Sequence, residues 1–161
     1  MEVRELKKLS VVIERPAEEA YAFLSVPENF PRWASGLGAA LRNVDGEWEA
    51  HTAEGRVRVR FSEPNARGVL DHAVILPEGG SVYVPLRVVP RGSGCELVLT
   101  LFRRPGMSDD KFEADARWVM RDLHAAKRLL ESQRALGHEE GLASGSDTIP
   151  PRGACSSRRS A

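Results

Sequence analysis

The hydrophobic pattern near the start of the chain changes from a strand type to a helix type. Residues 5–14 contain the β-branched run VVI, which predicts a β-strand. Pro16 suits the first position of an α-helix, and the acidic residues after it suit the first turn. Pro27 ends this helix and opens a second short one that runs to Phe30. The pattern therefore predicts one strand followed directly by two short helices.

Two later segments, residues 47–52 and 56–61, alternate strictly between apolar and polar positions. Such alternation is typical of half-buried strands, and the turn AEG between the segments predicts a β-hairpin. A two-residue loop at Ala53-Glu54 or at Glu54-Gly55 gives the same pairing of faces. The apolar face then consists of Trp48, Ala50, Thr52, Val57, Val59 and Phe61. Acidic residues meet the three arginines of RVRVRF on the other face, so this arginine stripe has a structural explanation that needs no nucleic acid.

Three more strands and a long helix complete the pattern. The strands span residues 68–76, 79–89 and 94–102, with turns rich in glycine and proline between them. Ser108 is a suitable N-cap and Gly137 a suitable stop, which predicts a helix of about 40 Å that ends at Leu136. Its apolar stripe consists of Phe112, Ala116, Val119, Met120, Leu123, Ala126 and Leu130.

These elements define a fold class. All connections within the sheet can be hairpins, so the sheet is predicted to be antiparallel. Its apolar face needs cover, and only the long helix is large enough to provide it. We therefore predict an α+β domain over residues 1–136, in which a curved antiparallel sheet wraps around the C-terminal helix. Residues 137–161 are rich in Gly, Ser, Pro and charge, and we expect them to form a disordered tail.

Two segments carry a family resemblance. They are RPAEEAYAFLS at residues 15–25, followed by a proline and a tryptophan, and PGMSDDKFEADARWVMRDLHAAKRLLE at residues 105–131. Over about residues 3–134 the chain resembles the START-like, or SRPBCC, superfamily, and its bacterial polyketide cyclase/dehydrase-type members in particular. The resemblance implies a helix-grip fold with a deep hydrophobic cavity between the sheet and the C-terminal helix. It also implies an apolar ligand such as a lipid, polyketide or hormone, but the superfamily has no common catalytic motif.

The candidate lining residues follow from the predicted faces and from the resemblance. By resemblance, the two short helices support the long helix beside the cavity mouth, which places Phe30 and Trp33 near the entrance. A core position for Trp33, beneath the loop that follows it, is an equal alternative. The candidate ligand-binding residues are Phe30, Trp33, Trp48, Val57, Val59, His72, Val84, Phe112 and Met120.

The triplet LDH at residues 70–72 offers the best candidate for chemistry. Neighbouring residues of a strand point to opposite faces, so Asp71 fits the outer face as a counter-charge to the arginine stripe. His72 then points inward, where an imidazole can act as a general base or donate a hydrogen bond to a ligand carbonyl. The alternative is a structural histidine whose ring is satisfied by its neighbours.

The strand over residues 79–89 leaves one orientation open. Tyr83 and Arg87 share a face, and the valines and leucine that alternate with them are expected to face inward. Pro85 would break a ladder hydrogen bond, and a flip of the face there would bring Arg87 to the pocket. Arg87 could then bind a carboxylate or phenolate.

Composition narrows the classes of partner and cofactor. The 161 residues include 23 basic and 23 acidic side chains, so there is no electrostatic case for nucleic acid or an anionic membrane. No apolar run reaches the roughly 20 residues that span a bilayer, and the charged N-terminus lacks a signal core, so we expect a cytoplasmic protein. Cys95 and Cys155 form neither a disulfide framework nor a metal site. No nucleotide or hydrolase motif is present, and no cofactor or metal is expected.

Three functions stay open from the sequence. The first is binding of a small hydrophobic or aromatic molecule with catalysis by His72, as in a cyclase or dehydratase. The second is a carrier without chemistry, and the third is an interaction module of the co-chaperone kind. We expect a monomer or homodimer, because a second helix stripe with Trp118 and Leu129 either packs under the short helices or forms a dimer contact.

Overall fold

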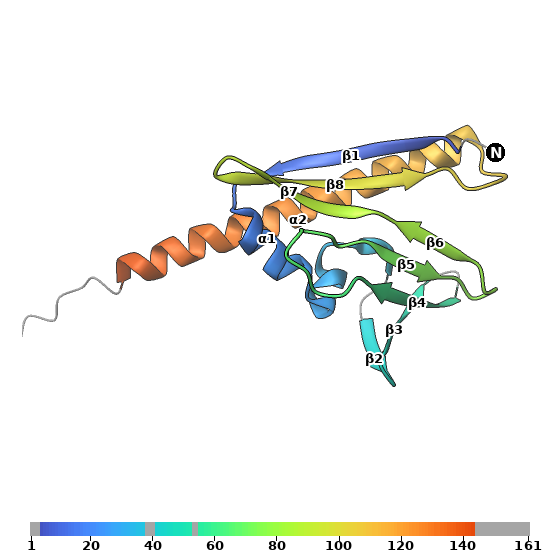
Figure 1. Cartoon of the computed structure of the whole chain (residues 1–161), viewed down its shortest axis with the longest axis horizontal. Helices are drawn as coiled ribbons and strands as arrows, with labels where there is room; N and C mark the ends of the chain where they lie inside the picture. Colours follow the sequence, from blue (N-terminus) through green and yellow to red (C-terminus); the bar gives the residue numbers. More distant parts are fainter. Residues whose placement is uncertain (1–3, 38–40, 53–54, 144–161) are drawn as a thin grey trace, which may run out of the picture.

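The computed structural model describes residues 4–37, 41–52 and 55–143 of the chain. Its strands are β1 (Leu6–Ile13), β2 (Leu41–Val44), β3 (Glu47–Thr52), β4 (Gly55–Phe61), β5 (His72–Ile75), β6 (Ser81–Val84), β7 (Leu86–Arg91) and β8 (Gly94–Phe102). Its helices are α1 (Ala17–Leu24), the 3₁₀ helices η1 (Pro27–Arg32) and η2 (Ser35–Leu37), and α2 (Asp109–Ala143). Figure 1 shows these elements from the side, with α2 behind the sheet.

The predicted fold class is confirmed. Every strand pair among the described residues is antiparallel, the short helices follow β1, and a long helix closes the chain. The hairpin of β3 and β4 has the predicted register, with Trp48 opposite Val59 and Ala50 opposite Val57. This is the helix-grip arrangement, in which a bent antiparallel sheet holds one long helix.

Three details differ from the sequence prediction. Strand β2 was not predicted, and the segment 79–89 forms two strands rather than one because Pro85 has no N–H to offer a ladder. Helix α2 also continues past Leu136 and through Gly137 to Ala143, since the residues beyond this glycine include good helix formers. The remainder of the predicted tail, residues 144–161, lies outside the described residues.

The bent sheet consists of a three-stranded part and a five-stranded part, which meet at Pro85. Their strand orders are β1-β8-β7 and β2-β3-β4-β5-β6. The Thr100 N–H donates to the Pro85 carbonyl at 3.0 Å, and the Leu70 N–H donates to the Leu86 carbonyl at 2.8 Å. The segment 79–89 therefore passes from the five-stranded part to the three-stranded part, and the sheet bends at this crossing.

The Asp71 carboxylate fixes this bend from the outer face. It accepts hydrogen bonds from the Leu86 N–H at 3.0 Å and from the Tyr83 hydroxyl at 2.5 Å. The Arg87 guanidinium donates to both of its oxygens, at 3.2 and 3.0 Å. The outward orientation predicted for Asp71 is confirmed, but its partners are Tyr83 and Arg87.

The arginine stripe of β4 pairs with acidic residues of β3, as predicted, and Asp71 is not one of its partners. Arg58 and Arg60 lie within ion-pair distance of Glu47 across the hairpin, and Arg56 lies within that distance of Glu49. Cross-strand pairs on a solvated face therefore account for the stripe. Arg87 stays on the outer face, so the alternative in which it reaches the pocket is wrong.

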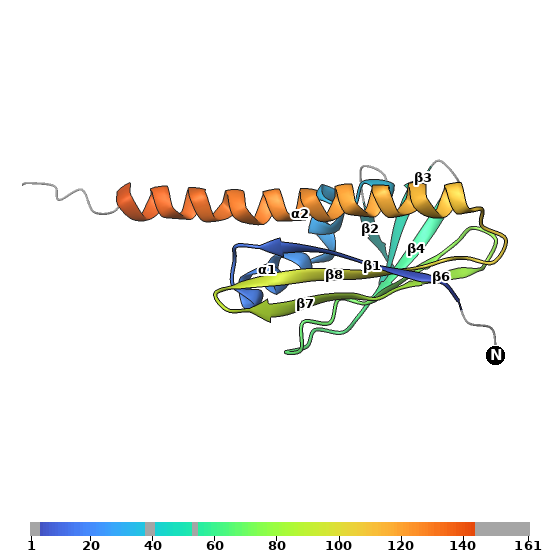
Figure 2. The ribbon, with the colours of Figure 1, turned by 90° about the horizontal axis from the view of Figure 1, so that it is seen from above.

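Helix α2 lies along the edge of β1, as Figure 2 shows from above. The Lys127 Nζ donates to the Val12 carbonyl at 2.7 Å, and the Glu14 N–H donates to Glu131 at 3.1 Å. The Arg15 guanidinium donates to the Leu130 carbonyl at 2.7 Å. These contacts attach the middle of α2 to the end of β1, and the ribbon of the helix then extends past the sheet.

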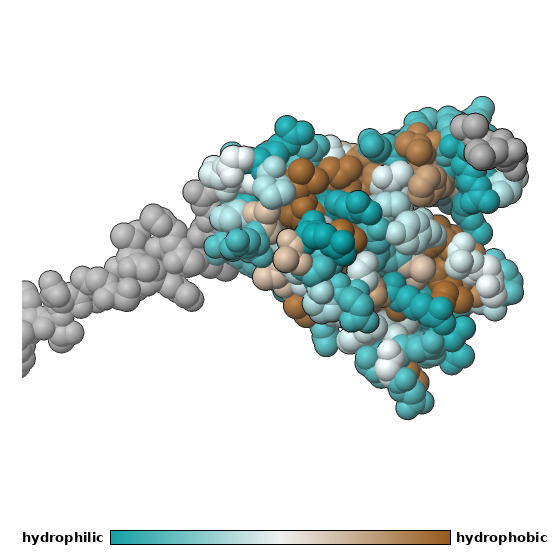
Figure 3. All heavy atoms as spheres, viewed as in Figure 1, coloured by the Kyte–Doolittle hydropathy of each residue, from teal (hydrophilic) through white to brown (hydrophobic). Residues whose placement is uncertain are grey.

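The concave face of the sheet has two halves that differ in how well they are covered. In the closed half, near α1, apolar side chains from β1, β7, β8 and α2 are almost fully buried; they include Ile13, Leu86, Val88, Leu97, Leu123 and Leu130. In the open half, toward the other end of the sheet, Ala50, Val57 and Val59 are buried, but larger apolar side chains around them stay partly exposed; they include Leu9, Trp48, Phe61, Val74, Val84, Leu101 and Met120. Figure 3 shows the opposite, outer face of the sheet, where hydrophobic atoms appear in patches among hydrophilic ones.

Candidate functional site

Strand register brings the candidate residues of β4, β5 and β6 into one row. Phe61 lies opposite His72, and His72 lies opposite Val84. Directly paired residues of an antiparallel sheet project to the same face, so these three side chains share the concave face. A neighbouring row contains Trp48, Val59, Val74 and Val82.

An aromatic cluster forms where η1 meets the first of these rows. The ring of Phe30 lies edge-to-face against Trp33, His72 and Phe61, at centroid distances of 4.9, 5.1 and 5.3 Å. Trp48 extends the cluster through Phe61 at 6.5 Å. Edge-to-face pairs are a favoured geometry and stabilise the group beyond the burial of its area. Phe30 is thus the centre that connects the short helices to the sheet.

His72 is the polar member of this cluster, and the structure fixes its chemical state. Its ring is buried, and Nδ1 lies 3.2 Å from the Leu70 carbonyl oxygen. Because a carbonyl can only accept, Nδ1 carries the proton and Nε2 keeps its lone pair. Burial lowers the pKa of His72 and outweighs the opposing effects of Leu70 and Asp71, so the ring is neutral at pH 7.

A small hollow lies beside His72. Its volume is about 30 Å³, which is room for one or two water molecules. It is lined by Tyr21, Leu24, Ser25, Phe30, Phe61, Ser62, Pro64, Leu70, His72 and Leu86. Pockets that hold drug-sized ligands have volumes of roughly 300–1,000 Å³. A larger molecule that reaches His72 therefore needs additional space from the open half or from movement of η1.

The other predicted lining residues lie in three places. Val57 and Val59 are buried on the concave face beside Trp48, which is partly exposed, as is Val84. Phe112 is buried near the start of α2, away from the aromatic cluster, with Lys7 and Arg103 over its ring at 5.4 and 5.8 Å. Met120 lies on α2 at the border of the open half, beside Leu9 and Trp118.

Trp33 is buried, with 4% of its surface exposed, which favours the core position over the entrance. Its neighbour Phe30 is equally buried. The indole Nε1 of Trp33 has no hydrogen-bond partner among the described residues. The second helix stripe runs beside these aromatics, but Trp118 is 47% exposed, so its packing under the short helices is incomplete.

Phe61 is a member of the site that sequence analysis did not single out. It was assigned to the apolar face of its hairpin, and that part is confirmed, because Phe61 lies opposite the buried His72. Its contact with His72 depends on the pairing of β4 with β5 across the loop 62–71, and no pattern in the sequence defines that register. In the structure Asn65 holds this loop, because its side-chain oxygen accepts from the N–H groups of Arg67 and Val69, both at 3.0 Å.

The electrostatics of the outer face are separate from the cluster. Burial raises the pKa of Asp71, but hydrogen bonds from Arg87, Tyr83 and the Leu86 N–H outweigh it and hold the pKa below its ordinary value. The same carboxylate raises the pKa of Tyr83. The Asp71 side chain is therefore ionised at neutral pH and acts on the bend of the sheet, on the opposite side from His72.

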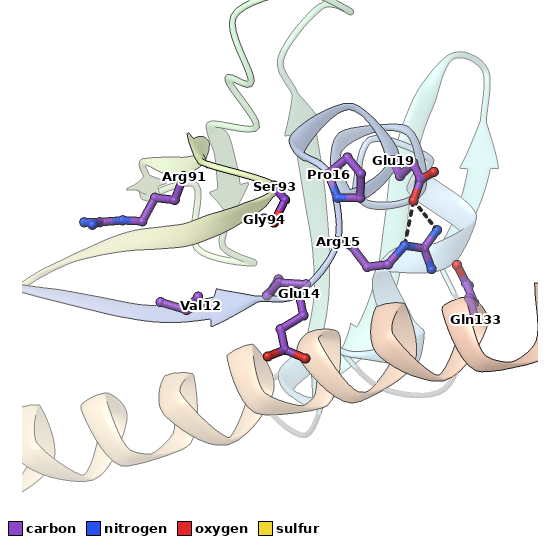
Figure 4. Close-up of a pocket in the computed structure, with 10 residues that line it drawn as sticks. Val12, Glu14, Arg15, Pro16, Glu19, Arg91, Ser93, Gly94 and Gln133 are labelled. Atoms are coloured by element: carbon purple, nitrogen blue, oxygen red, sulfur yellow. Dashed lines mark hydrogen bonds and ion pairs between the residues drawn. The ribbon is translucent and has the colours of Figure 1, made fainter. Parts of the chain in front are cut away.

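A larger surface groove lies where β1 turns into α1, close to α2 and the β7–β8 turn (Figure 4). Its volume is about 880 Å³. Charged side chains line it, and they pair with one another: Arg15 lies 2.6 Å from Glu19, and Arg91 pairs with Glu96 nearby. Arg15 also binds the Leu130 carbonyl of α2. We interpret this groove as a structural junction that attaches α2 to β1 and α1.

The described residues hold neither a cluster of metal-ligating side chains nor a membrane-spanning helix. No group of three or more His, Cys, Asp or Glu side chains among them is placed to hold a metal ion. Within the same residues, no helix is long and apolar enough to cross a membrane.

The comparison with known families gives the decisive match. The family described as "polyketide cyclase / dehydrase and lipid transport" matches residues 8–133. The chain belongs to this family. The match includes every described strand except the first residues of β1, and it ends within α2. No curated protein matches the sequence.

Several solved structures have a fold similar to that of this chain. An uncharacterised protein from Bacillus thuringiensis has a TM-score of 0.63 at 11% identity, covering 78% of this chain and 98% of its own. A START superfamily protein from Mycobacterium smegmatis has a TM-score of 0.61 at 14% identity, covering 81% and 99%. The Zhui aromatase/cyclase from a Streptomyces species has a TM-score of 0.59 at 16% identity, covering 80% and 94%. At these identities the likeness shows the fold alone.

Proposed function

We propose that this chain binds a small hydrophobic or aromatic molecule in the open half, between the concave face of the sheet and α2. The observation that carries the proposal is the incomplete burial of large apolar side chains there, including Trp48, Phe61 and Val74. Exposed apolar area on a concave surface is costly in water, and a hydrophobic ligand that covers it recovers that free energy. Membership of a family named for polyketide cyclases, dehydrases and lipid transport supports the same conclusion.

A matched pair of substitutions tests binding. Val74 faces the open half and Val12 lies on the outer face of β1, where it is 55% exposed. Val74→Gln places an amide in the proposed site without disturbing the closed half, and Val12→Gln makes the same chemical change outside it. The probe is anilinonaphthalene sulfonate, whose fluorescence rises in apolar surroundings. We expect Val74→Gln to weaken binding by about tenfold and Val12→Gln to leave it unchanged.

Native mass spectrometry of the purified protein complements this titration. A co-purifying apolar molecule that is lost in Val74→Gln and retained in Val12→Gln supports the proposal and identifies the ligand. Equal probe affinity for both variants, together with no bound mass in the wild-type protein, would overturn it.

A second candidate function, proton transfer to the bound molecule, rests on the state of His72. A neutral imidazole whose Nε2 keeps a lone pair, packed against Phe30 and Phe61, has the form of a general base. Cyclase and dehydratase chemistry both begin by removing a proton from a carbon next to a carbonyl. The substrate class would be an aromatic or linear polyketide, in agreement with the family name.

Hydrogen–deuterium exchange at the α-carbon of 2-tetralone tests this second function without knowledge of the natural substrate. The protein is added in D₂O, and NMR follows the loss of the α-proton signal. We expect acceleration that His72→Gln abolishes and that the control His124→Gln, on the exposed side of α2, retains. Binding with no acceleration would leave a carrier as the function of this site.

A further inference from the structure

The small hollow beside His72 has polar side chains in its wall, and their hydrogen bonds distinguish them. These side chains are Tyr21, Ser25, Ser62 and His72. The Ser25 hydroxyl donates to the Ala22 carbonyl at 3.4 Å, and the Ser62 hydroxyl donates to the backbone carbonyl of Asp71. A hydroxyl group has a single hydrogen, so neither serine keeps a donor for a molecule in the hollow.

Tyr21 is the hydroxyl donor that remains. Its oxygen accepts a hydrogen bond from the Asn65 N–H at 2.9 Å, so its own hydrogen is left for another acceptor. No acceptor for this hydrogen is present among the described residues. Pro64, which precedes Asn65, also lines the hollow, so the hydroxyl end of Tyr21 lies at this wall. Helix α1 thus brings one available O–H donor to the hollow.

His72 supplies the same hollow with an acceptor. Its Nδ1 is bound to the Leu70 carbonyl, whereas its Nε2 has no partner among the residues that the structure describes. The side chain is only 6% exposed, yet Nε2 keeps some accessible surface. Among those same residues, the one fully buried side-chain nitrogen or oxygen without a partner is Nε1 of Trp33. Because the hollow borders the His72 ring, the Nε2 lone pair is open to it.

The hollow lies at the inner end of the open half. Phe61 is one of the partly exposed side chains of the open half, and it also lines the hollow beside His72. A volume of about 30 Å³ is room for a carbonyl group but not for an aromatic ring. The rings of a ligand therefore stay in the open half, near Trp48 and Val74, and only a carbonyl group reaches inward.

We propose that the Tyr21 hydroxyl donates a hydrogen bond to the carbonyl oxygen of the bound molecule while Nε2 of His72 removes a proton from the adjacent carbon. This inference rests on the proposed proton transfer by His72, and it names the substrate class as a ketone with a hydrogen on the α-carbon. The C–H bond breaks and its proton forms an N–H bond on Nε2. The C–H electron pair forms a C=C bond, and the π pair of the carbonyl moves to its oxygen. The Tyr21 O–H group stabilises the negative charge that develops there.

The 2-tetralone exchange assay tests this donor with a second substitution. Tyr21→Phe keeps the ring and removes the hydroxyl, and we expect it to lower kcat of the exchange about 100-fold while KM stays within about twofold. The matched control is Tyr83→Phe, because Tyr83 is the other tyrosine of the chain and lies exposed on the outer face. We expect this control to keep the wild-type rate.

Binding of 2-naphthol separates the loss of the hydrogen bond from a general loss of structure. This molecule is the aromatic counterpart of the enol of 2-tetralone, and naphthalene has the same rings without the hydroxyl. Protein labelled with 3-fluorotyrosine has two ¹⁹F signals, which Tyr83→Phe assigns. We expect 2-naphthol to shift the Tyr21 signal and naphthalene to leave it in place. Tyr21→Phe should weaken 2-naphthol about fivefold and naphthalene by less than about twofold.

The outcomes separate this inference from the function on which it rests. A full exchange rate in Tyr21→Phe, together with its loss in His72→Gln, would remove Tyr21 from the reaction and leave His72 as the base. No acceleration by the wild-type protein would contradict proton transfer by His72, and the 2-naphthol titration would then decide whether Tyr21 donates to a bound oxygen. A Tyr21 signal that does not move while 2-naphthol binds overturns the donor in either case.

Discussion

The two halves of the concave face use the same kinds of apolar residue and reach different degrees of burial. In the closed half, α1 and the middle of α2 cover the sheet, and Ile13, Leu97 and Leu123 have no exposed surface. In the open half the sheet has turned away at Pro85, and Trp48 and Val74 stay partly exposed. Side-chain type therefore does not distinguish a core from a candidate binding surface here. The bend of the sheet and the contacts of α2 make the difference.

The largest expected effect is on stability, and it differs between two residues of α2 that face different halves. Leu123→Ala opens a cavity in the closed half, and we expect it to lower the free energy of unfolding by about 2–5 kcal/mol. Met120→Ala, less than one turn away at the border of the open half, should cost clearly less, because its side chain is already partly in water. Urea denaturation of both variants measures this. Equal losses would contradict the division into halves.

The bend between the halves is the next target. Asp71→Asn removes the charge that binds Arg87 and weakens its bonds to Tyr83 and Leu86, and we expect a loss of about 2 kcal/mol at pH 7. The pKa of Asp71 is lowered in the folded state, so its contribution is present above the unfolded pKa near 4 and disappears as the pH falls through the folded pKa. Urea denaturation at pH 7 and pH 3 should therefore show the difference between wild type and variant shrinking in acid. A constant difference would contradict this account.

His72 should make stability depend on pH in a different range. Its pKa is lowered in the folded state, so below about pH 6.5 the unfolded chain binds a proton that the folded chain excludes. We expect the wild type to lose up to about 1.4 kcal/mol per pH unit as the pH falls below 6.5. His72→Gln should remove this slope, which urea titrations between pH 7.5 and 5.5 can measure. His124→Gln, as control, should keep it.

The smallest effect concerns Trp48. Because its ring is partly exposed in the open half, we expect Trp48→Phe to change the free energy of unfolding by less than about 1 kcal/mol. Urea denaturation of Trp48→Phe beside the wild type measures this. A stability loss comparable to that of Leu123→Ala would mean that the open half is a core like the other.

Several of these features could be predicted from the sequence and others could not. Alternation predicted the β3–β4 hairpin and its register, because a short loop leaves few ways to pair two strands. The Asp45-Gly46 turn before β3, with φ values of 52° and 87°, is a hairpin signal that was present in the sequence and was not used, so β2 was missed.

The candidate site depended on information of another kind. The inward orientation of His72 followed from the alternation of side chains along its strand. Its neighbours did not, because Phe30 and Phe61 reach it from η1 and from β4 across loops that set no register. The small volume beside His72 likewise depends on the packing of α1, which the hydrophobic pattern does not determine.

The attachment of α2 to β1 has a consequence for solubility. Among the described residues β1 has a ladder partner on one side only, so its other edge could pair with a strand of another molecule. At the end of that edge, Lys127 donates a hydrogen bond to the Val12 carbonyl, and Glu131 accepts one from the Glu14 N–H. Lys8 adds a charge farther along it. The helix thus covers the end of this edge, and we expect Lys127→Ala to leave the Val12 carbonyl free to accept from a strand of another molecule.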